Sequence, residues 1–180
     1  MKAIGFVGDS GSGKTTLIER LLARFAATGL RLAAVKHAHH GFDIDRPGKD
    51  SYRFRSAGAS QVLLASDQRW ALLCDEIEQD SDPASRLAQQ LARLGPCDLV
   101  LVEGFRGQTG IPFIEVQRRA LLDGSGARKP ARGPVAGAVA LATDDCAWAQ
   151  QQGRAIPIFA IDDIDAIAGF VAQHLELAPC

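Results

Sequence analysis

The segment GDSGSGKT at residues 8–15 constrains the fold of this chain more than any other stretch. It fits the phosphate-loop pattern, in which a glycine and four free positions precede Gly-Lys-Ser/Thr. The apolar run 3–7 before it is typical of a short buried strand, and apolar side chains recur after it at helical spacing up to Gly29. Strand, glycine-rich loop and helix together predict a nucleotide-binding α/β protein.

The residue types of this loop suit a triphosphate. Glycines let backbone N–H groups turn inward at a helix N-terminus, where the partial positive charge favours anions. Lys14 is expected to reach the β- and γ-phosphates, and Thr15 to place its hydroxyl on Mg²⁺.

Length and composition bound the remaining possibilities. The 180 residues suit one domain, and 20 Lys and Arg against 21 Asp and Glu leave no basic excess for nucleic acid. No apolar run is long enough to span a membrane, and the first strand follows Met1-Lys2 without room for a signal peptide, so we expect a cytoplasmic protein. The four cysteines are scattered, which indicates neither a disulfide framework nor a zinc knuckle.

A carboxylate that would help to bind Mg²⁺ is predicted at the end of another strand. Residues 99–102 are four apolar residues in a row, as in a central strand buried on both faces. Glu103 ends this run and is expected to be the second partner of Mg²⁺, usually through a water. Gly104 would let the backbone pass close to the γ-phosphate. Asp98, at the opposite end of the strand, is interpreted as a turn residue.

The polar segment 36–51 follows a predicted strand at 30–35 and should overhang the ligand. Lys36, His37 and Asp50 are its expected nucleotide contacts. Together with His39 and His40, His37 also raises the possibility of a metal site, although such a cluster more often forms hydrogen bonds and contacts phosphate. A structural alternative makes Asp50 the cap of a helix that starts near residue 51.

Two apolar runs at 61–65 and 70–74 predict a β-hairpin, which is an insertion into a chain that otherwise alternates strands and helices. It would either extend the sheet edge or pair with another subunit. The acidic run 75–82 is interpreted as solvated, with Pro83 opening a helix to about residue 94. The predicted fold class is therefore an α/β P-loop NTPase, a mostly parallel sheet flanked by helices with an inserted hairpin.

The last third of the chain predicts strands at 112–116, 135–142 and 157–161 and a closing helix to about residue 175. The basic stretch 118–132 is either a mobile lid or an ordinary loop. Asp144 is the candidate for reading the N1 and N2 donors of guanine. For the other late carboxylates, the alternatives to a guanine contact are helix capping and a surface position. These residues are Asp145, Asp162 and Asp163.

Several motifs together resemble the MobB family of GTP-binding accessory proteins of molybdopterin guanine dinucleotide biosynthesis. The resemblance rests on residues 8–16, 36–40 (KHAHH), 43–45 (DID), 47–51 (PGKDS), 57–59 (AGA), 68–72 (QRWAL) and 102–106 (VEGFR), with weaker likeness at 142–144 and 161–165. The histidine-rich segment joined to PGKDS is much more particular than the phosphate loop.

This resemblance implies a homodimer that binds GTP and Mg²⁺ at residues 8–16 and hydrolyses GTP weakly. It also implies partnership with MobA, which attaches GMP to molybdopterin, and with MoeA, which inserts molybdenum. Asp9 stands where dimerisation-activated ATPases carry an extra lysine. The guanine signature Asn-Lys-x-Asp is missing, which leaves base selectivity to Thr143 and Asp144.

The candidate site can be stated as three sets. The candidate catalytic residues are Lys14, Asp9 and Glu103, and the metal partners are Thr15 and Glu103. The candidate nucleotide-binding residues are Gly8, Ser10, Gly11, Ser12, Gly13, Lys14, Thr15, Thr16, Lys36, His37, Asp50, Gly104, Thr143 and Asp144. Two other functions compete: a P-loop kinase for a small metabolite, with Asp43, Asp45 or Asp50 as base, and a metal-delivery GTPase using His37, His39 and His40.

Overall fold

The computed structural model describes residues 1–38, 45–75, 82–105, 109–119 and 134–177. Its contacts divide the chain into two compact units: a sheet unit, Met1–His37 with Asp82–Cys180, and a hairpin unit, Ala38–Ser81. The sheet unit contains β1 (Lys2–Val7), α1 (Lys14–Ala26), β2 (Leu32–Lys36), α3 (Pro83–Leu91), β5 (Leu99–Glu103), β6 (Phe113–Gln117), β7 (Ala140–Thr143), α4 (Cys146–Gln151), β8 (Ile158–Ala160) and α5 (Ile164–His174). The hairpin unit contains α2 (Asp50–Ser56), β3 (Gln61–Ala65) and β4 (Trp70–Cys74).

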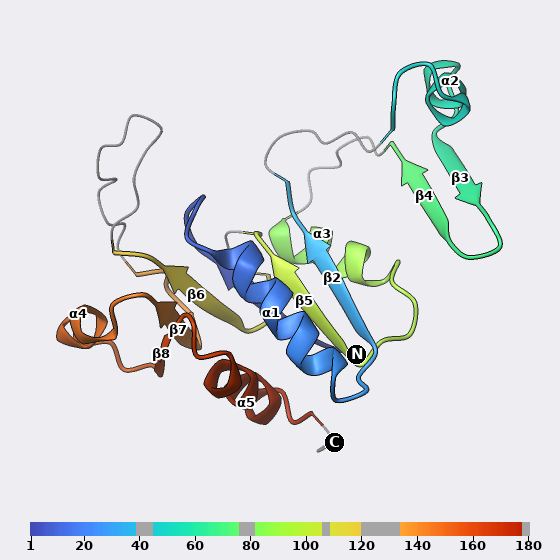
Figure 1. Ribbon diagram of the computed structural model, residues 1–180. Coiled ribbons are helices and arrows are strands. Elements are labelled where there is room, and N and C mark those ends of the chain that lie inside the picture. The colour runs from blue at the N-terminus through green and yellow to red at the C-terminus, as the bar shows by residue number, and fades with distance from the viewer. Residues whose placement is uncertain (39–44, 76–81, 106–108, 120–133, 178–180) are drawn as a thin grey trace. The chain divides into compact units, whose positions relative to one another are not determined.

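The six strands of the sheet unit lie in the order β2-β5-β1-β6-β7-β8, and each neighbouring pair is parallel (Figure 1). This arrangement confirms the predicted α/β fold with a mostly parallel sheet. Because the strands are parallel, their carboxyl ends meet at one edge of the sheet. The loop that follows β1 therefore has the ends of β5 and β6 as its immediate neighbours, with β2 and β7 ending one strand further out.

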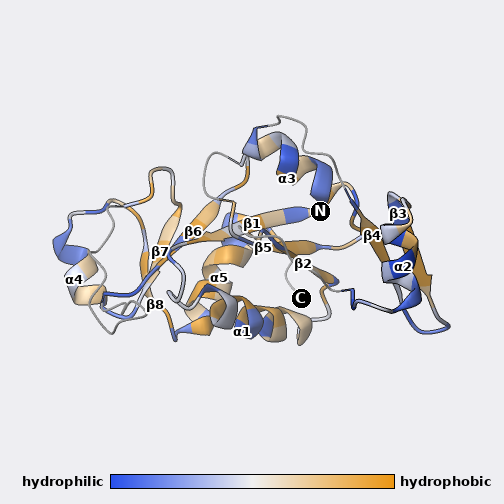
Figure 2. Cartoon of the chain, turned by 90° about the horizontal axis from the view of Figure 1, so that it is seen from above, coloured by the Kyte–Doolittle hydropathy of each residue, from blue (hydrophilic) through white to orange (hydrophobic). Residues whose placement is uncertain are grey.

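Strand β5 is buried on both faces of the sheet, as its apolar run predicts. Its residues 99–102 are at most 1% exposed. Leu99 and Leu101 pack with apolar side chains of α1 and α5, whereas Val100 and Val102 pack with Leu87 of α3. Figure 2 shows α1 and α5 on one side of the sheet and α3 on the other. Each such buried side chain contributes about 1.5–3 kcal/mol of transfer free energy, so the strand that carries Glu103 is held firmly.

Helices α3, α4 and α5 each begin at an aspartate that accepts a hydrogen bond from one of their first N–H groups, whereas α1 and α2 have no side-chain cap. Asp82 accepts hydrogen bonds from Ala84 and Ser85 at the start of α3, and Asp163 accepts one from Ala166 at the start of α5. Helix α1 has Gly13 at its N-cap, no side-chain cap and no acidic residue in its first turn. Its N-terminal partial charge is therefore left for another anion.

The hairpin unit contains the predicted hairpin as a sheet of its own. Strands β3 and β4 pair antiparallel from Gln61 with Cys74 to Ala65 with Trp70. The hairpin therefore does not extend the edge of the parallel sheet, and that alternative is wrong. Arg55 joins the two ends of this unit, because its guanidinium lies 3.5 Å from Asp45 and 3.1 Å from Asp75.

Two sequence-based expectations are corrected by the structure, and one helix is added. The strand expected from residue 135 begins at Ala140, because residues 136–137 form a turn in which Gly137 has φ 84°. Helix α4 follows Asp145, for which helix capping was one of the two alternative interpretations, although no helix range was predicted there. Asp50 does not cap α2: it is the first residue of that helix and lies 3.8 Å from Arg53 as an ion pair.

Asp98 has a more definite role than a turn residue. Its carboxylate accepts hydrogen bonds from the backbone N–H of Arg31 at 2.8 Å and from the Arg31 guanidinium at 2.9 Å. These bonds lower the pKa of Asp98, with the side-chain bond from Arg31 as the largest cause. They tie together the starts of β2 and β5, at the sheet edge opposite the phosphate loop.

Within the part of the chain that the structure describes, no helix is long and apolar enough to cross a membrane.

Candidate nucleotide-binding site

The phosphate loop joins β1 to α1 and is packed tightly against β6. A Cβ atom on Gly8 would come within 2.1 Å of the Val116 carbonyl oxygen, so a larger residue cannot be accommodated without moving the backbone. Gly11 and Gly13 have φ of 83° and 94°, in the region that favours glycine. Ser12 is fully buried between them. These residues fix the loop in one conformation at the N-terminus of α1.

Lys14 lies across the first residues of the loop. Its Nζ donates hydrogen bonds to the carbonyl oxygens of Asp9 at 2.7 Å and Gly8 at 3.1 Å. The ammonium charge is thus held beside the N-terminus of α1, where two positive features coincide. This arrangement suits a strongly anionic ligand and fits the role predicted for Lys14.

The hydroxyl of Thr15 donates a hydrogen bond to the Glu103 carboxylate, with 2.9 Å between Oγ1 and Oε2. The structure thus brings together the two residues predicted to face Mg²⁺, which are 88 positions apart in sequence. The other carboxylate oxygen of Glu103 lies 3.4 Å from Lys36 Nζ at the end of β2. A hydroxyl and one carboxylate are hard oxygen donors, and Mg²⁺ commonly takes such a pair with phosphate oxygens and waters. The donor set therefore fits Mg²⁺.

His37 and Gly104 lie in contact at the ends of β2 and β5. The His37 N–H donates to the Glu103 carbonyl at 2.9 Å, and a Cβ on Gly104 would lie 3.1 Å from His37. Gly104 has φ 94°, and Phe105 follows with φ 54°, its ring centroid 4.5 Å from that of His37. Glycine at 104 is thus explained by close approach to His37, and two consecutive left-handed residues turn the chain sharply beside Glu103.

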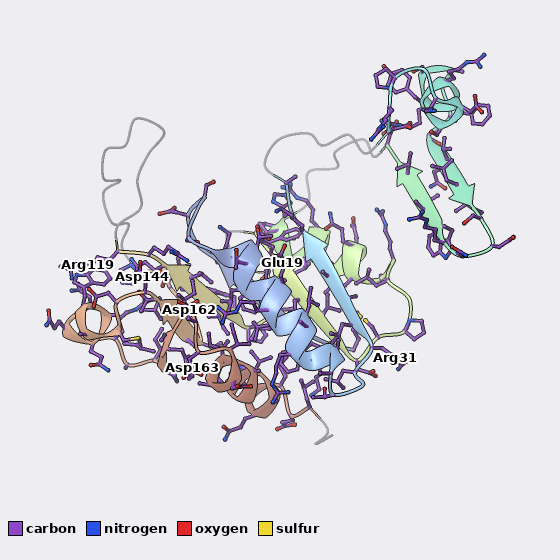
Figure 3. The ribbon with its side chains drawn as sticks, viewed as in Figure 1. Glu19, Arg31, Arg119, Asp144, Asp162 and Asp163 are labelled. Atoms are coloured by element: carbon purple, nitrogen blue, oxygen red, sulfur yellow. The ribbon has the colours of Figure 1, made fainter. Side chains whose placement is uncertain are left out.

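Thr143 and Asp144 lie at the end of β7, as predicted. Thr143 is fully buried, and its hydroxyl accepts a hydrogen bond from the N–H of Asp145 at 3.2 Å. One oxygen of Asp144 accepts from the backbone N–H of Arg119 at 2.9 Å, and Figure 3 shows these two residues side by side. This bond orients the Asp144 carboxylate at the end of β7.

The other late carboxylates have structural roles. Asp145 caps α4 through the N–H of Trp148 at 2.9 Å, and its second oxygen lies 2.6 Å from Arg119. These two contacts, the backbone bond first, lower the pKa of Asp145. Its contribution to stability is therefore present above about pH 4 and is lost as the pH falls through the folded-state pKa. Asp162 pairs with Arg20 on the surface at 2.7 Å.

Arg118 is a site residue that the sequence did not single out. Its Nε donates to the carbonyl oxygen of Ser12 at 3.3 Å, so the side chain lies on the phosphate loop. In the sequence it was the first member of a basic stretch interpreted as a lid or a loop. In the sequence, the available signal was its position directly after a strand. The pairing of β6 with β1, which brings Arg118 to the loop, belongs to the tertiary structure.

The model of the family "Molybdopterin guanine dinucleotide synthesis protein B", MobB, matches residues 3–143. This chain belongs to the MobB family. It is 34% identical over 174 residues to the molybdopterin-guanine dinucleotide biosynthesis adapter protein of Escherichia coli K12, covering 96% of this chain and 93% of that protein. It is 46% identical over 118 residues to the protein of the same name from Haemophilus influenzae, covering 66% and 64% of the two chains.

A solved structure of this family has the same fold. The crystal structure of Bacillus subtilis MobB aligns with a TM-score of 0.68 at 26% identity, covering 97% of this chain and 98% of that one. The matched MobB region includes the phosphate loop, Glu103 and Arg118, and it ends at Thr143, one residue before Asp144. Some sequence-based candidates of this MobB protein, His39, His40 and Asp43 among them, lie outside the described residues, as does most of the basic stretch 118–132.

Proposed function

We propose that this MobB protein is a GTP- and Mg²⁺-binding adapter of molybdopterin guanine dinucleotide biosynthesis. The observation that carries the nucleotide part is the contact of Thr15 with Glu103 beside a loop that holds Lys14 at a helix N-terminus. The adapter part is supported by the names of the E. coli and H. influenzae relatives. Family membership favours this function over a metabolite kinase or a metal-delivery GTPase.

Different residues are proposed to bind the polyphosphate, the Mg²⁺ ion and the guanine base. Backbone N–H groups of the loop and Lys14 neutralise the polyphosphate, and Thr15 with Glu103 would hold Mg²⁺, which neutralises charge on the β- and γ-phosphates when bound. Asp144 is proposed to select guanine. Because position 9 is Asp, no lysine from there adds charge at the γ-phosphate, which is consistent with weak hydrolysis.

MobA and MoeA are the proposed partners, and the test of the adapter role is reconstitution with MobA. Purified MobA, molybdopterin, Mg²⁺ and GTP are combined with or without this protein, and molybdopterin guanine dinucleotide is quantified. We expect more product with the parent protein and no stimulation by Lys14→Ala. Equal product with and without the parent would reject the adapter function, and a phosphorylated acceptor formed without MobA would favour the kinase.

We also propose that the protein is a homodimer whose interface includes the hairpin. Large apolar side chains of the hairpin unit are exposed to unusual extents: Phe54 59%, Leu63 62%, Leu64 45%, Trp70 70% and Leu72 48%. Exposed apolar groups of this size commonly mark an interaction surface. A second copy of the same hairpin is the proposed occupant because a two-fold axis matches a patch with itself.

Trp70→Arg is expected to convert a dimer to a monomer, because a charge would be buried in the contact. Sedimentation at micromolar concentration measures this directly, with Gln68→Arg in the hairpin turn as the control that should stay dimeric. A parent protein that sediments as a monomer would reject the homodimer.

A further inference from the structure

Arg118 and Lys14 lie at different ends of the phosphate loop. It follows β6 and donates from Nε to the Ser12 carbonyl oxygen at 3.3 Å. A Cβ atom placed on Gly13 would lie 3.3 Å from both Nε and Nη2 of Arg118. The guanidinium therefore lies over Ser12 and Gly13, whereas the Lys14 ammonium lies over Gly8 and Asp9.

The surroundings of Arg118 are electrostatically unfavourable without an anion. It lies beside Gly13, the N-cap of α1, and the first turn of that helix has no acidic residue. Among the described residues no carboxylate pairs with Arg118, although the neighbouring Arg119 pairs with Asp145 and Arg154 with Glu115. A cation at a helix N-terminus is repelled by the helix dipole. A bound anion in contact with both would be attracted to each of them and would offset this repulsion.

The order of the strands indicates which part of a nucleotide reaches Arg118. Glu103 and Lys36 come from β5 and β2, on one side of β1, and form the side of the site suited to the metal and the terminal phosphate. Arg118 follows β6 on the other side of β1, and Asp144 follows β7 beyond it. Loop N–H groups take the α- and β-phosphates, and the loop lysine takes the β- and γ-phosphates. Arg118 is therefore placed between the phosphates and the base.

We propose that Arg118 binds the α-phosphate of the nucleotide through its terminal guanidinium nitrogens, with Nε anchored on Ser12. This inference rests on the proposed nucleotide binding at the loop. It adds a second cation to the site, one that acts on di- and triphosphate alike because both have an α-phosphate. A purely structural role would instead make Arg118 a brace that holds the loop through the Ser12 carbonyl.

Binding of GTP and GDP to the full chain, measured by calorimetry, tests this proposal. Arg118→Ala is expected to lower both affinities by the same factor, about tenfold to a hundredfold, and to reduce their dependence on salt. Arg118→Gln keeps an N–H donor without the charge, so it should show the same loss. The matched control Arg24→Ala, which removes a surface arginine paired with Asp165, should bind both nucleotides as the parent does.

Each other outcome has a distinct meaning. A parent protein that binds neither nucleotide rejects the proposed function, and this inference with it. If the parent binds and Arg118→Ala binds equally well, the inference alone is rejected. A loss confined to GTP would assign Arg118 to the γ-phosphate and overturn the proposal. Full recovery of affinity in Arg118→Gln, with a lowered thermal midpoint of nucleotide-free Arg118→Ala, would establish the brace instead.

Discussion

Lys14→Ala is expected to lower the affinity for GTP by roughly two orders of magnitude or more, because it removes charge-assisted hydrogen bonds to two phosphates. The affinity for GTP should fall more than the affinity for GDP, since the γ-phosphate loses a contact that GDP never makes. The fold should persist. Lys14 is only partly buried, and its Nζ donates to the loop carbonyl oxygens of Gly8 and Asp9, so its removal takes nothing from the hydrophobic core.

Calorimetry and thermal melting of the same preparations check this expectation. Lys2→Ala is the matched control, because Lys2 is an exposed lysine at the opposite end of β1. It should bind GTP as the parent does. Unchanged GTP affinity in Lys14→Ala would show that the loop does not bind the polyphosphate, and a large fall in its melting temperature would make Lys14 a structural residue.

Glu103→Gln is expected to weaken GTP binding about tenfold or more in Mg²⁺ and not at all in chelator. The substitution keeps the shape of the side chain but removes the charge that a metal requires. Without metal, a carboxylate near the γ-phosphate repels it, so the variant should bind metal-free GTP as well as the parent or better. Thr15→Ala should follow the same pattern, since its hydroxyl and the Glu103 carboxylate are in contact.

Titrations of GTP in Mg²⁺ and in chelator give the two affinities for each variant. Glu19→Gln is the control, because Glu19 lies on the exposed side of α1. It should match the parent under both conditions. Equal losses with and without Mg²⁺ in Glu103→Gln would remove this residue from the metal site.

The part of the site built from local pattern was predictable from sequence. The glycines and Lys14 follow a fixed spacing, and the four apolar residues before Glu103 required a central strand, whose carboxyl end in a parallel sheet lies beside the loop. The hairpin strands were predictable for the same reason, since two short apolar runs flank a four-residue turn.

The remaining features depend on contacts between distant segments. Arg118 reaches the loop because β6 pairs with β1, a pairing that no local signal encodes. Helix α4 has six residues, too short for an apolar period to appear, although its cap Asp145 was a visible signal. The apolar residues from 135 onward suggested a strand, but Gly137 turns the chain before Ala140 joins the sheet.

Equilibrium titration of the purified protein with GTP and with ATP, in the presence of Mg²⁺, tests the central claim most directly. We predict saturable binding of GTP with one site per chain, weaker binding of ATP, and loss of the GTP signal in Lys14→Ala. Absence of saturable binding of GTP by the parent protein, or binding that Lys14→Ala retains unchanged, would contradict it.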